Sequence, residues 1–244
     1  MSRRRAARSL QYPQLVGRKQ LAGDGLATPY SGASLTSLTD GLATAPATGD
    51  IIFIGYSLGD IADATMTIQD AGGSNYTLVG SELYSNDTRD INLRVAYKVA
   101  GGSPDTTFNF NDGFAGDSGA TVIMVQVWRY FNVSSPLDVS AVTAVGTNTG
   151  QPNPGSITPA TRGSVILSFS AGSAATGSTP TDLANSDHTA FWAASRSGTN
   201  YASAAGGHGY KLWTGGAFDP SAYTGGSSST LDAWASVILA LRPA

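Results

Sequence analysis

Asp50-Ile-Ile-Phe-Ile-Gly-Tyr-Ser-Leu-Gly-Asp60 marks the point where the character of the chain changes. Before this stretch the sequence is poor in large apolar side chains, and after it short apolar or alternating runs continue to the C-terminus. A segment with so little apolar mass cannot bury enough surface to order itself alone. We therefore predict an extended N-terminal arm over residues 1–49 and a single compact domain over residues 50–244.

The runs after residue 50 have the periodicity of β-strands. Residues 90–99 place Ile91, Leu93 and Val95 on one face, with Asn92 and Arg94 on the other. Residues 120–129 are apolar on both faces for most of their length, which is typical of a central strand. About nine to eleven such runs, separated by turns, predict an all-β fold, namely a two-sheet antiparallel β-sandwich that is jelly-roll-like. The first and last runs, both strongly apolar, are candidates for pairing at its centre.

The composition agrees with many strands joined by turns. Charged residues make up 13% of the 244 residues, against roughly 25% in an average globular protein. The polar balance comes from Ser, Thr, Asn and Gly, which favour turns. The absence of cysteine excludes disulfides, thiol nucleophiles and Cys-based metal sites. No apolar run approaches the roughly 18 residues of a membrane span, so we expect none.

The charge is distributed unevenly along the chain. Six of the 14 basic residues precede the first acidic residue, Asp24, and all 17 acidic residues follow from there. These six are Arg3, Arg4, Arg5, Arg8, Arg18 and Lys19. A basic arm on an acidic body can dock on an acidic partner subunit or on nucleic acid. We favour the partner subunit, and we expect nucleic-acid contact only through the arm.

Gly55-Tyr56-Ser57-Leu58-Gly59 matches the Gly-x-Ser-x-Gly nucleophile elbow of serine hydrolases. The elbow needs a strand, a sharp turn and a helix, and an acid and a histidine must follow in the sequence. Residues 60–68 are poor helix formers, and His188 and His208 are the only histidines. A hydrolase that uses Ser57 is therefore the third of our hypotheses. We expect these residues to be a strand end and a turn, and the protein not to be an enzyme.

Two polar or aromatic groups are candidate binding sites. Asn109, Asn111, Asp112 and Asp117 lie close enough in sequence to gather oxygen ligands for Ca²⁺. They lack the spacing and the bidentate Glu of an EF-hand, and Asx-rich turns look the same, so we predict no metal and no cofactor. Tyr201, Tyr210, Trp213 and Tyr223 crowd the C-terminal quarter. Exposed rings stack on sugar faces, so these four are candidate glycan contacts.

Four short segments carry a resemblance to a known family. These are Asp50–Tyr56, Asn92–Val99 with the Ala-Gly-Gly-Ser-Pro that follows it, Val127–Leu137, and Val237–Ala244. They resemble tailed-bacteriophage virion proteins, which are β-sandwich head-decoration and tail or fibre modules, some of them lectin-like. The resemblance spans about residues 50–244 and transfers no catalytic residues. It implies a capsid-decorating (cement), spike or tail component of a virion, assembled with other virion subunits as a symmetric homo-oligomer. The alternative that it implies is a lectin-like adhesion module for host surface glycans.

Overall fold

The computed structural model describes residues 11–23, 30–60, 62–87, 89–113, 119–147, 151–199, 201–226 and 232–244. Within these residues the protein is all-β, and every strand pair is antiparallel. The all-β prediction is therefore confirmed. None of the described residues belongs to a helix with the length and apolar character needed to cross a membrane.

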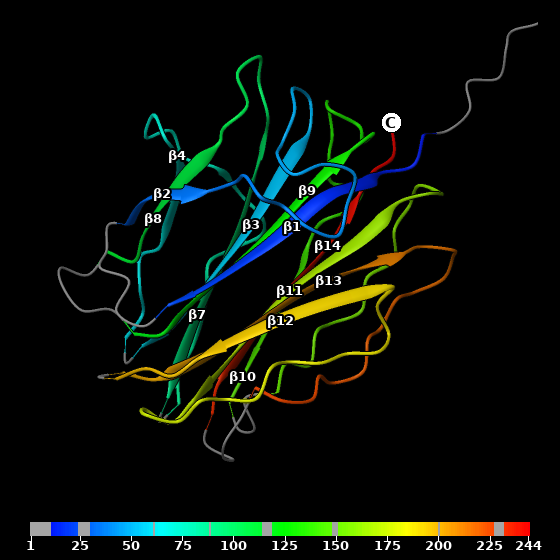
Figure 1. The fold of residues 1–244 in the computed structure, drawn as a ribbon. Coiled ribbons are helices and arrows are strands. Elements are labelled where there is room, and N and C mark those ends of the chain that lie inside the picture. The colour runs from blue at the N-terminus through cyan, green and yellow to red at the C-terminus, as the bar shows by residue number, and fades with distance from the viewer. Residues whose placement is uncertain are drawn as a thin grey trace, which may run out of the picture.

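Three sheets make up the fold (Figure 1). The central sheet runs β1 (Gln14–Gly23), β9 (Thr121–Arg129), β3 (Ile51–Asp60), β7 (Asp90–Val99) and β5 (Thr77–Leu78), and β6 (Leu83–Ser85) also pairs with β7. The C-terminal sheet runs β10 (Val142–Gly146), β14 (Trp234–Leu241), β11 (Val165–Ala174), β13 (Ser203–Leu212) and β12 (Ala190–Arg196). The small sheet runs β2 (Tyr30–Ser34), β8 (Thr107–Asn111) and β4 (Thr67–Asp70).

The central sheet is the middle layer, because both of its faces are buried. In β3, Ile51 and Phe53 pack against the C-terminal sheet, whereas Ile52 and Ile54 pack against the small sheet. Successive side chains of a strand point to opposite faces, so a strand buried on both faces must be apolar throughout. This burial explains the unbroken apolar runs of β3 and β9. The predicted central position of residues 120–129 is confirmed, since β9 lies between β1 and β3.

The alternating strand β7 uses its second face to anchor neighbouring segments. Ile91, Leu93 and Val95 enter the core between the two larger sheets, as the alternation predicts. On the other face, Asn92 is fully buried; its amide oxygen accepts a hydrogen bond from the Ala64 backbone N–H at 3.0 Å, and its amide nitrogen donates to the Ala62 carbonyl at 3.0 Å. The polar face of β7 therefore holds the segment that leads into the small sheet.

The strand order refines two parts of the sequence-based prediction. The first nine strands form the central and small sheets, and the last five form the C-terminal sheet. The chain passes several times between the central and small sheets, but it enters the C-terminal sheet only after β9, and the jelly-roll part of the prediction is not confirmed. The expected pairing of the first and last apolar runs is wrong, because β3 and β14 lie in different sheets.

The boundary expected at residue 50 also differs from the structure. Residues 14–23, expected in an extended arm, form strand β1, which pairs with β9 along its full length. Val16 and Leu35 from the same region are fully buried in the core beneath the small sheet. The described part of residues 11–49 therefore belongs to the folded body. Arg3, Arg4, Arg5 and Arg8 lie outside the described residues.

Candidate functional site

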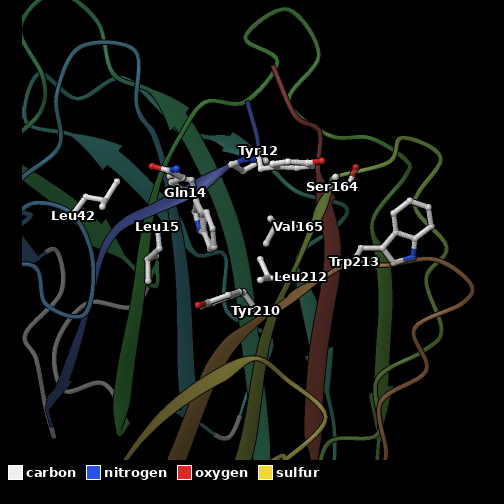
Figure 2. Close-up of a pocket in the computed structure, with 12 residues that line it drawn as sticks. Tyr12, Gln14, Leu15, Leu42, Ser164, Val165, Tyr210, Leu212 and Trp213 are labelled. Carbon is white, nitrogen blue, oxygen red and sulfur yellow. The ribbon is translucent and has the colours of Figure 1, made fainter. Parts of the chain in front are cut away.

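A pocket of about 550 Å³ opens at one end of the sandwich (Figure 2). Its walls come from five separate segments: the start of β1, the end of β9, the start of β11, the end of β13 and the loop around Leu42. In the view of Figure 2, Tyr12 and Tyr210 bound it on opposite sides, with Val165 and Leu212 between them. The volume lies within the range typical of small-molecule sites, roughly 300–1,000 Å³.

Antiparallel pairing brings these segments together. Gln14 of β1 is in register with Arg129 of β9, and Val165 of β11 is in register with Leu212 of β13. The start of one strand therefore adjoins the end of the next at the same end of the molecule. In Figure 1, the C-terminus and the start of β1 lie together at this end.

Gly163 is required beside Tyr12 for two reasons. Its φ is +90°, a backbone conformation that residues with a side chain rarely adopt. A Cβ at this position would lie 2.4 Å from Cε1 of Tyr12, so the tyrosine ring packs directly on the glycine backbone. This contact fixes one wall of the pocket.

Aromatic packing and internal hydrogen bonds fix the other walls. The rings of Trp128 and Tyr210 meet edge to face, with centroids 5.1 Å apart. The Trp128 indole N–H donates to Gln126 Oε1 at 3.1 Å, and the Trp213 indole N–H donates to the Gly216 carbonyl at 2.8 Å. Both indole nitrogens are therefore already used inside the protein.

Asp138 anchors the loop that carries Gly163 and Ser164. Its carboxylate accepts hydrogen bonds from the backbone N–H groups of Ala160 (2.6 Å) and Thr161 (2.8 Å) and pairs with Arg242 at 3.1 Å. Burial raises the pKa of Asp138, but these hydrogen bonds, with that from the Thr161 hydroxyl, outweigh burial and hold the pKa below its usual value. Asp138 therefore stays ionised and holds one rim of the pocket.

Exposed apolar side chains gather around this pocket. The described residues include six large hydrophobic side chains that are exposed, and five of them lie at this end. We call these five the apolar end face: Tyr12, Leu42, Tyr130, Val133 and Leu212. Leu42 is 60% exposed and Leu212 is 50% exposed, whereas the sixth residue, Val145, lies in β10 at the opposite end. Clustered exposed apolar surface of this kind marks an interaction site more often than scattered residues do.

Tyr130 gives this end face a strained residue. Its φ is +61°, which is uncommon for any residue except glycine and costly for a bulky one. Its neighbour Arg129 is held by Asp50 through two hydrogen bonds, of 2.7 and 2.9 Å. The hydrogen bond to Asp50 raises the pKa of Arg129 above its ordinary value. The ion pair therefore fixes the backbone next to the strained tyrosine.

The four candidate glycan residues do not form one platform. Tyr210 and Trp213 line the pocket. Tyr223 is 1% exposed and packs with Leu183 on the outer face of the C-terminal sheet. Tyr201 lies near Gly119 at the opposite end of the sandwich. The sequence-based grouping missed Tyr12, Leu42 and Trp128, because sequence proximity in one quarter of the chain gives no information on residues from distant strands.

The candidate calcium ligands are used in local structure. Asn109 Oδ1 accepts a hydrogen bond from the Gly32 N–H at 3.0 Å, and Asn111 Oδ1 accepts one from the Gly113 N–H at 2.8 Å. Asp112 is fully buried. Asp117 lies outside the described residues. Among the residues that the structure describes, no three His, Cys, Asp or Glu side chains gather at a spot that could hold a metal ion.

Ser57 does not lie in a nucleophile elbow. It is fully buried within β3, which continues to Asp60, and its hydroxyl donates to the Val122 carbonyl at 3.0 Å. The expected turn is also wrong, because Gly55 and Gly59 sit inside the strand. A Cβ on Gly55 would lie 2.7 Å from the Phe169 ring, so this glycine permits close packing of the two larger sheets.

A second serine has the hydrogen-bond order of a catalytic triad. The Ser168 hydroxyl lies 2.7 Å from His188 Nε2, and His188 Nδ1 lies 2.9 Å from Asn185 Oδ1. Because the amide oxygen only accepts, Nδ1 donates to it and Nε2 accepts from the serine. Burial lowers the pKa of His188 to about 4, so its ring is neutral at pH 7.

The surroundings of Ser168 nevertheless match a structural network. Ser168 is fully buried in β11, which pairs with β13 on one side and β14 on the other. Its neighbouring backbone N–H groups are used in these ladders, so none is available as an oxyanion donor. The sequence signal for this network was Asp187-His188, which by itself does not identify Ser168 or Asn185 as partners. The three side chains fix the covering loop on the sheet.

Two of the candidate docking residues are bound within the chain. Arg18 pairs with Asp40 at 2.6 Å and lies over the Trp192 ring, 5.2 Å from its centroid. The Lys19 ammonium donates to the Thr36 carbonyl at 2.9 Å. Both side chains therefore hold β1 against its own neighbours.

Comparison of the chain with protein-family models, with curated proteins and with solved structures gave no significant match.

Proposed function

We propose that the protein is a non-enzymatic structural component of a bacteriophage virion, such as a capsid-decoration, spike or tail subunit. The observation that carries this proposal is the apolar end face, which lies where the basic N-terminal segment joins the folded body. Exposed apolar surface next to a cluster of positive charge is typical of a docking surface for an acidic partner. The short segments that resemble phage virion proteins support the same class.

In this proposal the partners are other virion subunits, including further copies of the same chain in a homo-oligomer. The four arginines before residue 10 provide the long-range attraction, and the apolar end face provides the buried contact. Nucleic acid is contacted only through the basic segment, in which case binding should weaken steeply with salt.

The test is incorporation into particles. A chain lacking residues 1–10 retains β1 and should remain folded, but its incorporation should fall strongly. The Leu212→Glu variant, which places a charge on the apolar end face, should have the same effect, whereas Val145→Glu at the opposite end should incorporate normally. Electron microscopy of the particles would locate the chain. Normal incorporation of both altered chains would contradict the proposal.

A second candidate function is glycan binding, as in a host-attachment module. The observation in its favour is that Tyr210 and Trp213, two of the predicted glycan contacts, line one pocket together with Tyr12. Aromatic faces of this kind stack on sugar rings. A glycan array probed with the full chain and with Trp213→Ala tests this function. A flat response from the full chain would argue against it.

A further inference from the structure

Strand β12 leaves one edge of the C-terminal sheet open. It is the outermost strand of that sheet (Figure 1) and pairs only with β13. No other described segment forms a backbone hydrogen bond with Ala190–Arg196. In an antiparallel pair, alternate residues direct their N–H and C=O groups away from the partner strand. About half of the backbone polar groups of β12 therefore point outward from the sheet.

The edge of β1 is protected, whereas that of β12 is not. Residues 39–43 cover β1: Arg18 and Thr39 exchange two backbone hydrogen bonds, of 2.9 and 3.0 Å, and the Ala43 N–H donates to the Val16 carbonyl at 2.9 Å. Other edge strands are blunted by lysine, proline, a bulge or short length. Strand β12 has seven residues in unbroken register, contains no lysine or proline, and carries its one charge at its last residue. An edge of this kind is a template for a further strand.

A second pocket, of about 460 Å³, lies beside this edge. Phe191 and Ala193, on the outer face of β12, form one wall, and residues 182–186 form the other. Asp182 is exposed, and no described residue forms an ion pair with it. A basic side chain suits this pocket, because its aliphatic stem can pack on Phe191 and Leu183 while its charge faces the Asp182 carboxylate.

The open edge defines the occupant as a single β-strand. An added strand would lie about 4.8 Å from β12, with its side chains in step with those of β12. The side chain opposite Ala193 would therefore stand at the pocket. A second copy of the chain fits less well. Strand β1 lies over β12, with Arg18 Cζ 5.2 Å from the centroid of the Trp192 ring, so pairing two β12 strands would bring the second β1 into the place of residues 39–43.

We propose that the β12 edge binds an extended segment of a partner protein as an added β-strand, with one lysine or arginine of that segment in the pocket beside Asp182. Backbone hydrogen bonds provide the affinity, and the pocket provides the sequence preference. This pocket shares no residue with the pocket of the apolar end face, and the proposal does not rest on the virion function.

Amide hydrogen exchange, followed by NMR on the full chain, tests this proposal. The probe is the capped heptapeptide Thr-Val-Thr-Lys-Thr-Val-Thr, which should slow the exchange of the outward-facing amides of Ala190–Arg196. The amides of β10, at the other edge of the same sheet, should be unaffected. Two control peptides should bind at least ten times more weakly. One has glutamate for lysine, and the other is N-methylated at its lysine and at the threonine before it, which removes one N–H from each edge of the peptide.

Matched variants locate the binding. Asp182→Lys should weaken binding of the lysine peptide at least tenfold and reverse the preference between lysine and glutamate. Asp63→Lys, which changes an exposed carboxylate in the segment before the small sheet, should leave both unchanged. Undiminished binding of the N-methylated peptide, equal binding of the lysine and glutamate peptides, or no slowing of exchange in β12 would overturn the proposal. So would a free chain that sediments as a dimer with every β12 amide already protected, because a second copy would then occupy the edge.

Discussion

At the scale of single residues, His208 is a polar side chain whose burial could not be predicted from the sequence. Both ring nitrogens are buried without a hydrogen-bond partner, and the ring stacks on Phe169 and contacts Trp192. Burial, with a smaller contribution from the positive charge of Arg18, lowers the pKa of His208 to about 3. The folded protein therefore keeps this histidine neutral over most of the acidic range.

This burial predicts a loss of stability in acid. An unfolded chain takes up the proton near pH 6.5, whereas the folded chain resists it down to about pH 3, so stability falls as the pH drops below about 6.5. At pH 5 the loss from this one residue should be about 2 kcal/mol, at about 1.4 kcal/mol per pH unit. The variant His208→Leu should therefore gain that amount relative to the wild type between pH 8 and pH 5. Urea unfolding at the two pH values measures it, and an unchanged pH dependence would contradict the prediction.

Asp138 provides a second prediction at this scale. The variant Asp138→Asn replaces one carboxylate oxygen by an NH₂ group, which cannot accept hydrogen bonds. Either the bonds that the Ala160 and Thr161 N–H groups donate to Oδ2 or the bond that Arg242 donates to Oδ1 is then lost, and Arg242 loses its counter-charge. Breaking a buried pair of this kind costs about 3–5 kcal/mol. Thermal unfolding should show this loss. The backbone amide signal of Trp213 should also shift, because the Trp213 backbone N–H donates to the Ser164 carbonyl in the loop that Asp138 anchors. A loss below about 1 kcal/mol would show that the network is dispensable.

At the scale of elements, the strands that the sequence predicts well are those buried in a regular way. The alternating pattern of β7 and the continuous apolar run of β9 could be predicted because the polarity of each side chain matches the burial of the face on which it lies. Phe108 and Phe110 of β8 likewise alternate with polar residues, and both are buried in the second core.

Strand β1 could not be predicted in the same way. It is an edge strand that places Arg18, Lys19 and Gln20 in succession, and a register shift between Leu15 and Gly17 interrupts its alternation. Gly17 packs so closely on its neighbours that a Cβ there would lie 2.6 Å from Cβ of Leu38. Pairing with β9 and close backbone packing stabilise this strand, and neither leaves an apolar pattern in the sequence. The pocket could not be predicted for a related reason, because the pairing of strands that are distant in the sequence brings its five segments together.

The contact between the two larger sheets yields a prediction about Gly55. The variant Gly55→Ala would place a methyl group 2.7 Å from the fully buried Phe169 ring and 3.1 Å from Met124 Cε, so the sheets must shift apart locally. Overpacking of this kind costs about 1–3 kcal/mol. The matched control is Gly101→Ala, because a Cβ on Gly101 meets no atom within 4 Å. Equal unfolding free energies for the two variants would contradict this reading of the inter-sheet contact.

At the scale of the whole molecule, the three layers explain why the chain needs so few charged residues. The central sheet is covered on both faces, and loops that carry Ile157, Leu183 and Tyr223 cover the outer face of the C-terminal sheet. The strands β9, β11 and β14 are therefore buried along nearly their whole length. Turns rich in Ser, Thr, Asn and Gly provide much of the polar contact with solvent. The exposed apolar side chains that remain are concentrated at one end.

The position of β1 also determines how much of the N-terminal segment can be removed without unfolding the protein. An arm ending at residue 49 would predict that residues 1–20 can be removed without loss of the folded body. Since β1 covers one edge of the central sheet and buries Val16 completely, that prediction is no longer tenable.

A chain lacking residues 1–10 should unfold at the temperature of the full chain. A chain lacking residues 1–23 should lose the roughly 1.5–3 kcal/mol of a buried valine, in addition to the β1–β9 hydrogen bonds. Amide hydrogen exchange locates the destabilised part of the fold. The backbone amides of Val125 and Val127 in β9 should exchange faster only in the chain lacking residues 1–23. In that chain the Leu167 amide of β11 should exchange more slowly than these two. Equal melting temperatures for the two truncated chains would show that β1 is dispensable for the fold.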